Sequence, residues 1–209
     1  MSRETERYAK KFFLTNAVTL ARRLLGSVLV HETPEGRTAG AIVETEAYAG
    51  RRDAACHSYG RAAPTGNHRT DVMFAPGGRA YVYLIYGMYH CFNVTANVEG
   101  EAEAVLIRAL EPLEGLDLMV RRRGTDDPKK WCSGPGKLCI AMDISRADDG
   151  VDLTGEKIFL RKGKKIPDES VAATPRINVD YAGDDSLLPY RFVVRDSKFL
   201  STRKFLVRK

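Results

Sequence analysis

Two carboxylates and a phenol alternate along one stretch of the sequence. Glu44, Glu46 and Tyr48 lie two residues apart within Thr38–Tyr48, whose composition predicts a β-strand. Alternate residues of a strand share one face, which here also holds Ile42. Carboxylates on a core strand are costly unless they are paired or reached by water. Two interpretations stay open: an edge strand with its polar face in solvent, or a pocket wall that presents an acid or a base.

Arg108 interrupts an otherwise apolar run, Ala104–Leu110, which predicts another strand. A guanidinium inside such a strand needs a carboxylate partner, and Glu46 or Glu44 is the natural candidate. The pair could be a structural salt bridge. It could also hold the carboxylate ionised, which a base that activates water requires.

Tyrosines are concentrated at one place, where four of the nine occur at Tyr81, Tyr83, Tyr86 and Tyr89. Ala80–Tyr86 and Tyr89–Thr95 have β composition, and the intervening Gly87 predicts a hairpin with Tyr86 near its tip. Rings on strands usually pack in a core or across strands. A tyrosine at a hairpin tip is less easily explained in that way. A protein that binds nucleic acid, by contrast, uses such rings to stack on bases or to wedge between them.

Two further polar residues could serve a pocket. His57 lies early in residues 49–79, a segment rich in Gly, Arg, Asn and Pro that is long enough to indicate a functional loop. A lone histidine is more often a surface or satisfied core residue than a functional one. Asn93 falls inside a β run, where its amide needs partners, so it either ties down a neighbouring loop or lines a pocket.

Charge and composition indicate a globular protein with a polyanionic partner. The chain has 209 residues, a net charge of +6 and a pI of about 9.2. Its apolar runs are far shorter than a membrane span, and Met1–Lys11 lacks the apolar core of a secretory signal. We therefore expect no membrane association. We expect an intracellular protein, in the cytoplasm or nucleoid, or in the nucleus of a eukaryote.

The cysteines do not indicate a metal site. Cys56, Cys91, Cys132 and Cys139 include no C-x-x-C pair, so free buried thiols are expected. Cys56-His57 and His90-Cys91 are adjacent pairs, but neighbours on a strand point to opposite faces and would not converge on zinc. Nucleotide-binding and zinc-deaminase motifs are absent, so we expect neither a metal nor a cofactor. Ser133–Lys137 predicts either an anion site at a helix N-terminus or a plain helix cap.

The remaining patterns position these residues. Asn16 or Thr15 predicts the cap of a helix that runs to Leu25 and stops at Gly26. The other expected helices are Pro112–Arg123, with Leu113, Leu116 and Val120 inward, and Lys137–Met142. The other expected strands are Ser27–His31, Lys157–Arg161 and Tyr190–Arg195. Most connections are too short for parallel crossovers, and no repeat or linker is visible. The prediction is an α+β fold: a single mixed domain, residues 1–209, around a curved antiparallel β-sheet with a protruding β-hairpin, acting as a monomer.

Taken together and in order, these motifs resemble the alkyladenine (3-methyladenine) DNA glycosylase family. The resemblance spans roughly residues 15–197 at near-family spacing and is carried by Val43–Tyr48, His57-Ser58, Met73-Phe74, Tyr81–Met88, Cys91–Asn93, Arg108–Pro112, Ser133–Pro135 with Lys137-Leu138, and Val179–Gly183. No one of these motifs would suffice, but an ordered set of this length is highly specific.

The resemblance implies a monofunctional base-excision repair glycosylase that acts on double-stranded DNA containing alkylated or deaminated purines. Such an enzyme flips the damaged base out of the duplex and hydrolyses its N-glycosidic bond without lyase activity. Glu46 would deprotonate the attacking water, and Arg108 would help to hold that water and the carboxylate. Tyr86 would enter the minor groove and fill the gap left by the flipped nucleotide.

The resemblance also implies a pocket for the flipped base. Tyr48, His57 and Tyr83 would form it, with rings on either side of the base, and Asn93 would shape it against the amino group of normal guanine. The loop Gly60–Thr70 departs from the family pattern in length and composition. The reaction is therefore carried over by the resemblance, but a preference among 3-methyladenine, 7-methylguanine, hypoxanthine and ethenoadenine is not.

Two other functions are compatible with parts of the sequence. A non-catalytic nucleic-acid-binding module would use the basic charge and the rings without Glu46. An enzyme acting on small anions would use Arg108 and Ser133–Lys137 without Tyr86. The presence of both Glu46 and Tyr86 in family-like contexts argues against each of them.

Overall fold

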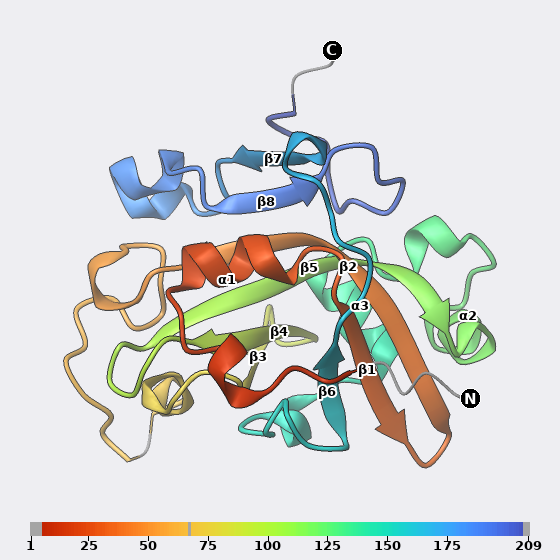
Figure 1. Ribbon diagram of the computed structural model, residues 1–209, viewed down its shortest axis with the longest axis horizontal. Helices are drawn as coiled ribbons and strands as arrows, with labels where there is room; N and C mark the ends of the chain where they lie inside the picture. The colour runs from red at the N-terminus through yellow and green to blue at the C-terminus, as the bar shows by residue number, and fades with distance from the viewer. Residues whose placement is uncertain (1–5, 67, 207–209) are drawn as a thin grey trace.

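A computed structural model of the chain describes residues 6–66 and 68–206, and in this part the chain forms one eight-stranded sheet with three α-helices packed on it (Figure 1). The helices are α1 (Ala17–Leu24), α2 (Leu116–Arg123) and α3 (Pro135–Met142). The strands are β1 (Val28–Thr33), β2 (Gly36–Tyr48), β3 (Ala80–Ile85), β4 (Tyr89–Ala96), β5 (Glu103–Glu114), β6 (Ile158–Arg161), β7 (Val171–Thr174) and β8 (Arg191–Val194). All the strand pairings are antiparallel, which confirms the predicted α+β class.

The sheet places β2 in its interior. The strand order is β3-β4-β5-β2-β1-β6, and β8 pairs with both β2 and β7. One edge of β2 pairs with β5, and the other pairs first with β1 and then with β8, where Glu46 lies opposite Arg191. Glu44 and Glu46 both have 0% exposed surface. The interpretation of an edge strand with its polar face in solvent is therefore wrong, because β2 has partners on both edges and both carboxylates are buried.

Helix α1 covers the face of β2 that points away from these carboxylates. The helix begins as predicted, because the Asn16 side chain accepts a hydrogen bond from the Thr19 amide at 2.9 Å. The Thr45 hydroxyl of β2 donates to the Ala21 carbonyl of α1 at 3.0 Å. Since neighbouring strand residues point to opposite faces, Glu44 and Glu46 point away from α1.

The expected helix Pro112–Arg123 begins later than predicted. Pro112 pairs with Gly40 of β2, and β5 continues to Glu114, so the first residues of that range are strand. Gly115 then turns the chain with a φ of +69°, and an added Cβ there would lie 2.3 Å from the Arg37 carbonyl oxygen. The inward side chains are Leu118 and Met119, whereas Leu113 and Leu116 are 45% and 44% exposed. Cross-strand pairing and the turn override the local helical pattern.

The predicted hairpin is confirmed as β3 and β4. The Met88 amide donates to the Ile85 carbonyl at 3.2 Å, and the turn between them holds Tyr86 at φ +54° and Gly87 at φ +69°. A bulky residue with positive φ is uncommon. Tyr86 is 77% exposed, so no packing contact explains that conformation.

The segment between β2 and β3 holds no strand in its described residues and contains two short 3-10 turns, Gly50–Arg52 and Asp71–Phe74. Asn67, in the loop that departs from the family pattern, lies outside the described residues. Across 6–66 and 68–206, none of the helices has both the length and the apolar character needed to cross a membrane.

Candidate active site

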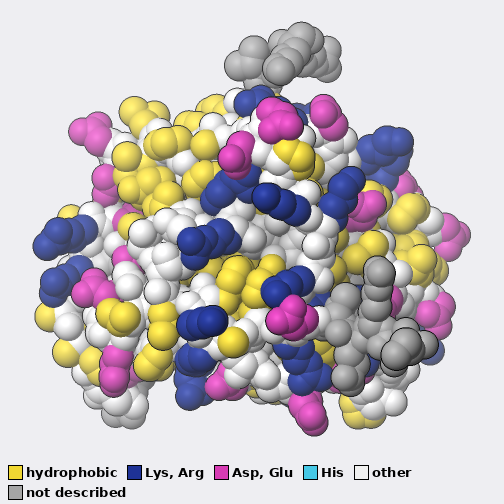
Figure 2. Space-filling model, in the orientation of Figure 1, with side chains coloured by type: hydrophobic (Ala, Val, Ile, Leu, Met, Phe, Trp, Pro, Cys, Tyr) yellow, Lys and Arg dark blue, Asp and Glu magenta, His cyan; other side chains and the backbone are white. Residues whose placement is uncertain are grey.

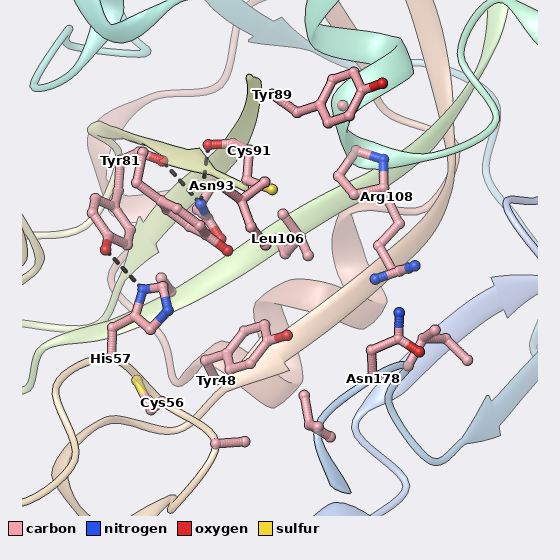
Figure 3. Close-up of a pocket in the computed structure, with 18 of the residues that line it drawn as sticks. Tyr48, Cys56, His57, Tyr81, Tyr89, Cys91, Asn93, Leu106, Arg108 and Asn178 are labelled. Carbon is pink, nitrogen blue, oxygen red and sulfur yellow. Dashed lines mark hydrogen bonds between the residues drawn. The ribbon is translucent and has the colours of Figure 1, made fainter. Parts of the chain in front are cut away.

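A cavity of about 580 Å³ opens between the sheet, the hairpin and two loops (Figure 3). This is a common size for a small-molecule site. Its walls include six of the seven residues singled out from the sequence: Tyr48, His57, Tyr83, Tyr86, Asn93 and Arg108. The seventh, Glu46, lies directly behind the wall. Residues that are distant in sequence thus line one cavity. Alternation along a single strand predicts which residues share a face, but not that faces of different strands meet.

Glu46 is completely buried, yet its hydrogen-bond donors all face the cavity. Its Oε1 accepts from the Ile177 amide at 2.7 Å, and its Oε2 accepts from the Tyr48 hydroxyl at 3.0 Å and from Arg108 Nη1 at 3.2 Å. All three donor residues line the cavity. A carboxylate can accept about four hydrogen bonds, so these three donors do not fill the capacity of Glu46.

The pairing of β2 with β5 is irregular at Arg108. Glu44 pairs with Ala109 and Thr45 pairs with Ile107, which leaves Arg108 without an opposite residue in β2. An extra residue of this kind bends the strand and re-aims its side chain, and such bulges are common beside active sites.

The re-aimed guanidinium joins the two carboxylates. Arg108 Nε donates to Glu44 Oε1 at 3.2 Å, and Nη1 donates to Glu46. Figure 3 shows the group extending toward the part of the cavity formed by Tyr48 and Asn178. Burial opposes the charge of Arg108, but the charges of Glu46 and Glu44 outweigh burial and raise its pKa. Arg108 therefore pairs with both of the carboxylates that the sequence offered as alternatives.

Tyr48 is held as a hydrogen-bond donor with a fixed ring. Its pKa lies well above the ordinary value, first because the phenol is buried and then because the Glu46 charge is adjacent. The guanidinium carbon of Arg176 lies 5.0 Å from the centre of the Tyr48 ring. The ring therefore has a cation at its back.

His57 and two tyrosines form the opposite aromatic group. The His57 ring lies edge-on to Tyr83, with ring centres 4.7 Å apart, and its Nδ1 is 2.9 Å from the Tyr81 hydroxyl oxygen (Figure 3). Burial, and then the charges of Arg69 and His68, lower the pKa of His57 to about 4. At neutral pH the histidine is therefore an uncharged ring in this wall.

Asn93 is fixed across the hairpin. Its Nδ2 donates to the Tyr81 carbonyl at 2.9 Å, and the side chain is 3% exposed (Figure 3). Of the two roles that the sequence left open, tying down a loop and lining a pocket, Asn93 lines the pocket, while its amide bonds to its own hairpin. The hydrogen bond to Tyr81 therefore fixes the position of the Asn93 side chain in the cavity wall.

Sequence reasoning missed the loop that closes the cavity opposite the hairpin. Ile177, whose amide holds Glu46, follows Arg176, and Arg176 forms a double hydrogen bond with Asp53 at 2.6 and 2.8 Å. Tyr181, on the rim, is 71% exposed and donates its hydroxyl to the Ala55 carbonyl at 3.2 Å. The signal for this loop in the sequence is the family-like segment Val179–Gly183, which follows it directly.

The other features singled out from the sequence lie in or near the same walls. All four cysteines are buried free thiols, and Cys56 and Cys91 line the cavity. Helix α3 starts at Pro135 without a side-chain cap, and Pro135 and Gly136 also line the cavity. Over the described ranges, no three His, Cys, Asp or Glu side chains are grouped as a metal ion would require.

Comparison with known proteins gives one consistent result. Residues 11–198 match the family model described as methylpurine-DNA glycosylase. A protein of Myxococcus xanthus is 45% identical over 192 residues, which is 92% of each chain. A protein of Alkaliphilus oremlandii is 42% identical over 202 residues, covering 93% of this chain and 98% of the relative. One from Methanoculleus marisnigri is 46% identical over 195 residues, covering 92% and 97%. All three relatives carry the name "Putative 3-methyladenine DNA glycosylase".

Proposed function

This chain belongs to the methylpurine-DNA glycosylase family and is a DNA N-glycosylase of DNA repair, and we propose that it hydrolyses damaged purines flipped into the cavity, with Glu46 as general base. The observation that carries the proposal is the hydrogen bonding of Glu46. Three donors from the cavity wall hold its two oxygens, and the carboxylate can accept about one more hydrogen bond, which we assign to the attacking water.

Glu46 acts on that water. The Tyr48 phenol and the Arg108 cation both donate to the carboxylate and orient it, and it takes a proton from the water as the oxygen attacks C1′ of the sugar and the C1′–N bond to the base breaks. The transition state resembles an oxocarbenium ion, as in other glycoside hydrolysis by water. The carboxylate charge beside the sugar favours the developing positive charge.

The aromatic walls hold the flipped base. Tyr48 stands on one side with Arg176 behind it, and His57 and Tyr83 stand on another side. A purine alkylated at a ring nitrogen carries positive charge, and π faces attract cations. The neutral state of His57 matters here, because an imidazolium would repel such a base.

Asn93 contributes selectivity. Its amide is anchored to the Tyr81 carbonyl and cannot move aside without breaking a buried hydrogen bond. A base that adds an exocyclic amino group at this wall, as guanine does, meets a fixed side chain and is disfavoured.

Tyr86 replaces the flipped base in the duplex. It is exposed at the tip of a hairpin that borders the cavity, and the ring can enter the minor groove as a wedge. Flipping costs least at damaged or mismatched pairs, which adds to the selectivity.

Basic charge brings the protein to DNA. On the face that carries α1, which points away from Glu44 and Glu46, Lys and Arg side chains are interspersed with Asp and Glu (Figure 2). The attraction to DNA therefore rests on the net charge of +6. Binding should therefore weaken as salt rises, through counterion release. No lysine is among the described residues lining the cavity, which supports hydrolysis without strand cleavage.

The test is single-turnover base release from alkylated DNA and from duplexes with one hypoxanthine or ethenoadenine. Glu46→Gln should lower the rate constant by about 10²–10⁴-fold while the variant still binds lesion-containing duplex. Glu99→Gln, at an exposed position, is the matched control and should release base at the wild-type rate. Full activity in Glu46→Gln would remove Glu46 as the base. Binding without release in the wild type would favour a non-catalytic module.

A further inference from the structure

Glu44 is a second buried carboxylate beside Glu46 and Arg108, and the proposed function gives it no role. Glu44 is 0% exposed and accepts four hydrogen bonds. Oε1 accepts from Arg108 Nε at 3.2 Å, from Arg191 Nε at 2.8 Å and from the Ser201 hydroxyl at 2.7 Å. Oε2 accepts from the Ser201 amide at 2.7 Å. Its hydrogen-bonding capacity is therefore filled by the protein, and in this it differs from Glu46.

Glu44 controls how Arg108 meets Glu46. A guanidinium is a rigid planar fork, so fixing Nε on one carboxylate determines where Nη1 points. The Nε of Arg108 lies on Glu44 and its Nη1 lies on Glu46. A displacement of Glu44 would therefore displace the donor that holds the proposed base.

The segment after β8 holds Glu44 in place. Ser201 gives the carboxylate both an amide and a hydroxyl, and its oxygen is also 3.5 Å from Arg108 Nη2. Arg191, itself 0% exposed, fixes that segment by donating to the Thr202 carbonyl at 2.7 Å and to the Lys204 carbonyl at 3.1 Å. Figure 1 shows this segment following β8 and passing beside β7.

The charges of this cluster balance. Two buried guanidinia, Arg108 and Arg191, face two buried carboxylates, Glu44 and Glu46. If Glu44 served only to neutralise the guanidinia, it would not need the Ser201 hydroxyl. That hydroxyl donates to Glu44 and also lies near Arg108. The matched family region ends at residue 198, before Ser201.

We propose that Ser201, acting through Glu44, is a positioning residue for base excision: it sets the orientation of Arg108 toward Glu46. The proposal rests on the proposed function of Glu46 as the base. Ser201 touches neither the water nor the flipped base. Its contribution is to the rate of the chemical step and not to DNA binding.

The experiment compares Ser201→Ala, Ser201→Thr and Thr202→Ala in the full chain. Ser201→Ala removes the hydroxyl, Ser201→Thr keeps it, and Thr202→Ala removes a hydroxyl whose contact is the Lys204 amide, at 3.1 Å. Each is measured for single-turnover release at saturating enzyme, for the Kd of lesion-containing duplex and for thermal stability. Wild type and Glu46→Gln are run beside them.

Ser201→Ala should release base roughly tenfold more slowly at unchanged Kd: a misplacement of about 1 Å can cost about 100-fold, and here the Ser201 amide still holds Glu44. The rate constants of Ser201→Thr and Thr202→Ala should stay within about twofold of wild type, because a twofold change in rate corresponds to a barrier change smaller than thermal energy. The inference is overturned if Ser201→Ala keeps the wild-type rate, if its loss appears in Kd, if Ser201→Thr fails to restore the rate, or if Thr202→Ala loses as much. An inactive wild type, or an active Glu46→Gln, would instead overturn the proposed function.

Discussion

The ion pair of Asp53 and Arg176 offers a measurable test of how the cavity loop is supported. The two side chains are 3% and 2% exposed, and two short hydrogen bonds join them. Arg176 also donates to the Ala47 carbonyl of β2 at 2.9 Å, and its neighbour Ile177 holds Glu46. Asp53→Asn would keep the shape of the side chain and remove its charge.

The expected loss of stability follows from burial. Leaving one member of a buried ion pair without its partner costs about 3–5 kcal/mol. A domain of about 200 residues loses about 2–4 °C in Tm for each kcal/mol, so the midpoint should fall by roughly 6–20 °C. Base release measured well below that midpoint should also slow, because the Ile177 amide would no longer be held as firmly against Glu46.

The assay combines thermal unfolding, followed by circular dichroism, with single-turnover base release at about 25 °C. The control is Glu6→Gln, which breaks the exposed pair of Glu6 with Lys162, whose side chains are 76% and 56% exposed. Asp53→Asn combined with Arg176→Met should recover part of the loss, because no unpaired charge stays buried. A midpoint for Asp53→Asn equal to that of Glu6→Gln would refute the reasoning.

Two further predictions concern the hairpin tip and the aromatic wall. Tyr86→Gly should keep or raise Tm, because glycine adopts φ +54° without steric cost, while release from duplex DNA falls by about tenfold or more through loss of the wedge; a lower Tm at an unchanged rate would contradict this. The pKa of His57 is lowered from 6.5 to about 4, so the unfolded chain binds a proton that the folded protein does not over that interval. The contribution of His57 to the free energy of unfolding is therefore complete above pH 6.5, and it is lost as the pH falls toward 4. Urea unfolding across that interval should show a shallower decline for His57→Gln than for wild type, and equal declines would show that another group is responsible.

Local patterns predicted the parts of the fold that local interactions determine. Asn16 caps α1, and Gly87 turns the hairpin, because each acts on residues near it in sequence. The alternation of Glu44, Glu46 and Tyr48 placed these side chains on one face, and the family resemblance identified the residues that the cavity gathers. Pro112–Glu114 was predicted incorrectly, because its strand partner, Gly40, is remote in sequence.

The supports of the site could not be predicted in the same way. Arg176 meets Asp53 across 123 residues, and Arg191 meets Glu44 across 147. Neither arginine lies in a pattern that marks it as buried, since its burial depends on a carboxylate elsewhere in the chain. Only the folded sheet brings these charges together.

The pairing of β8 with the interior strand β2 also has a consequence for how the protein is made. Glu44 and Ser201 are 157 residues apart, so a chain emerging from the ribosome can assemble β1 to β5 long before Arg191 and Ser201 exist. Until then Glu44 and Glu46 have the guanidinium of Arg108 but not that of Arg191. The part of β2 that will pair with β8 has no partner on that edge. Closing so long a loop is slow relative to local pairing. The buried cluster of Glu44, Glu46, Arg108 and Arg191 is therefore completed only after β8 has been made, and a nascent chain that lacks β8 would hold the cavity walls without the charge balance of this cluster.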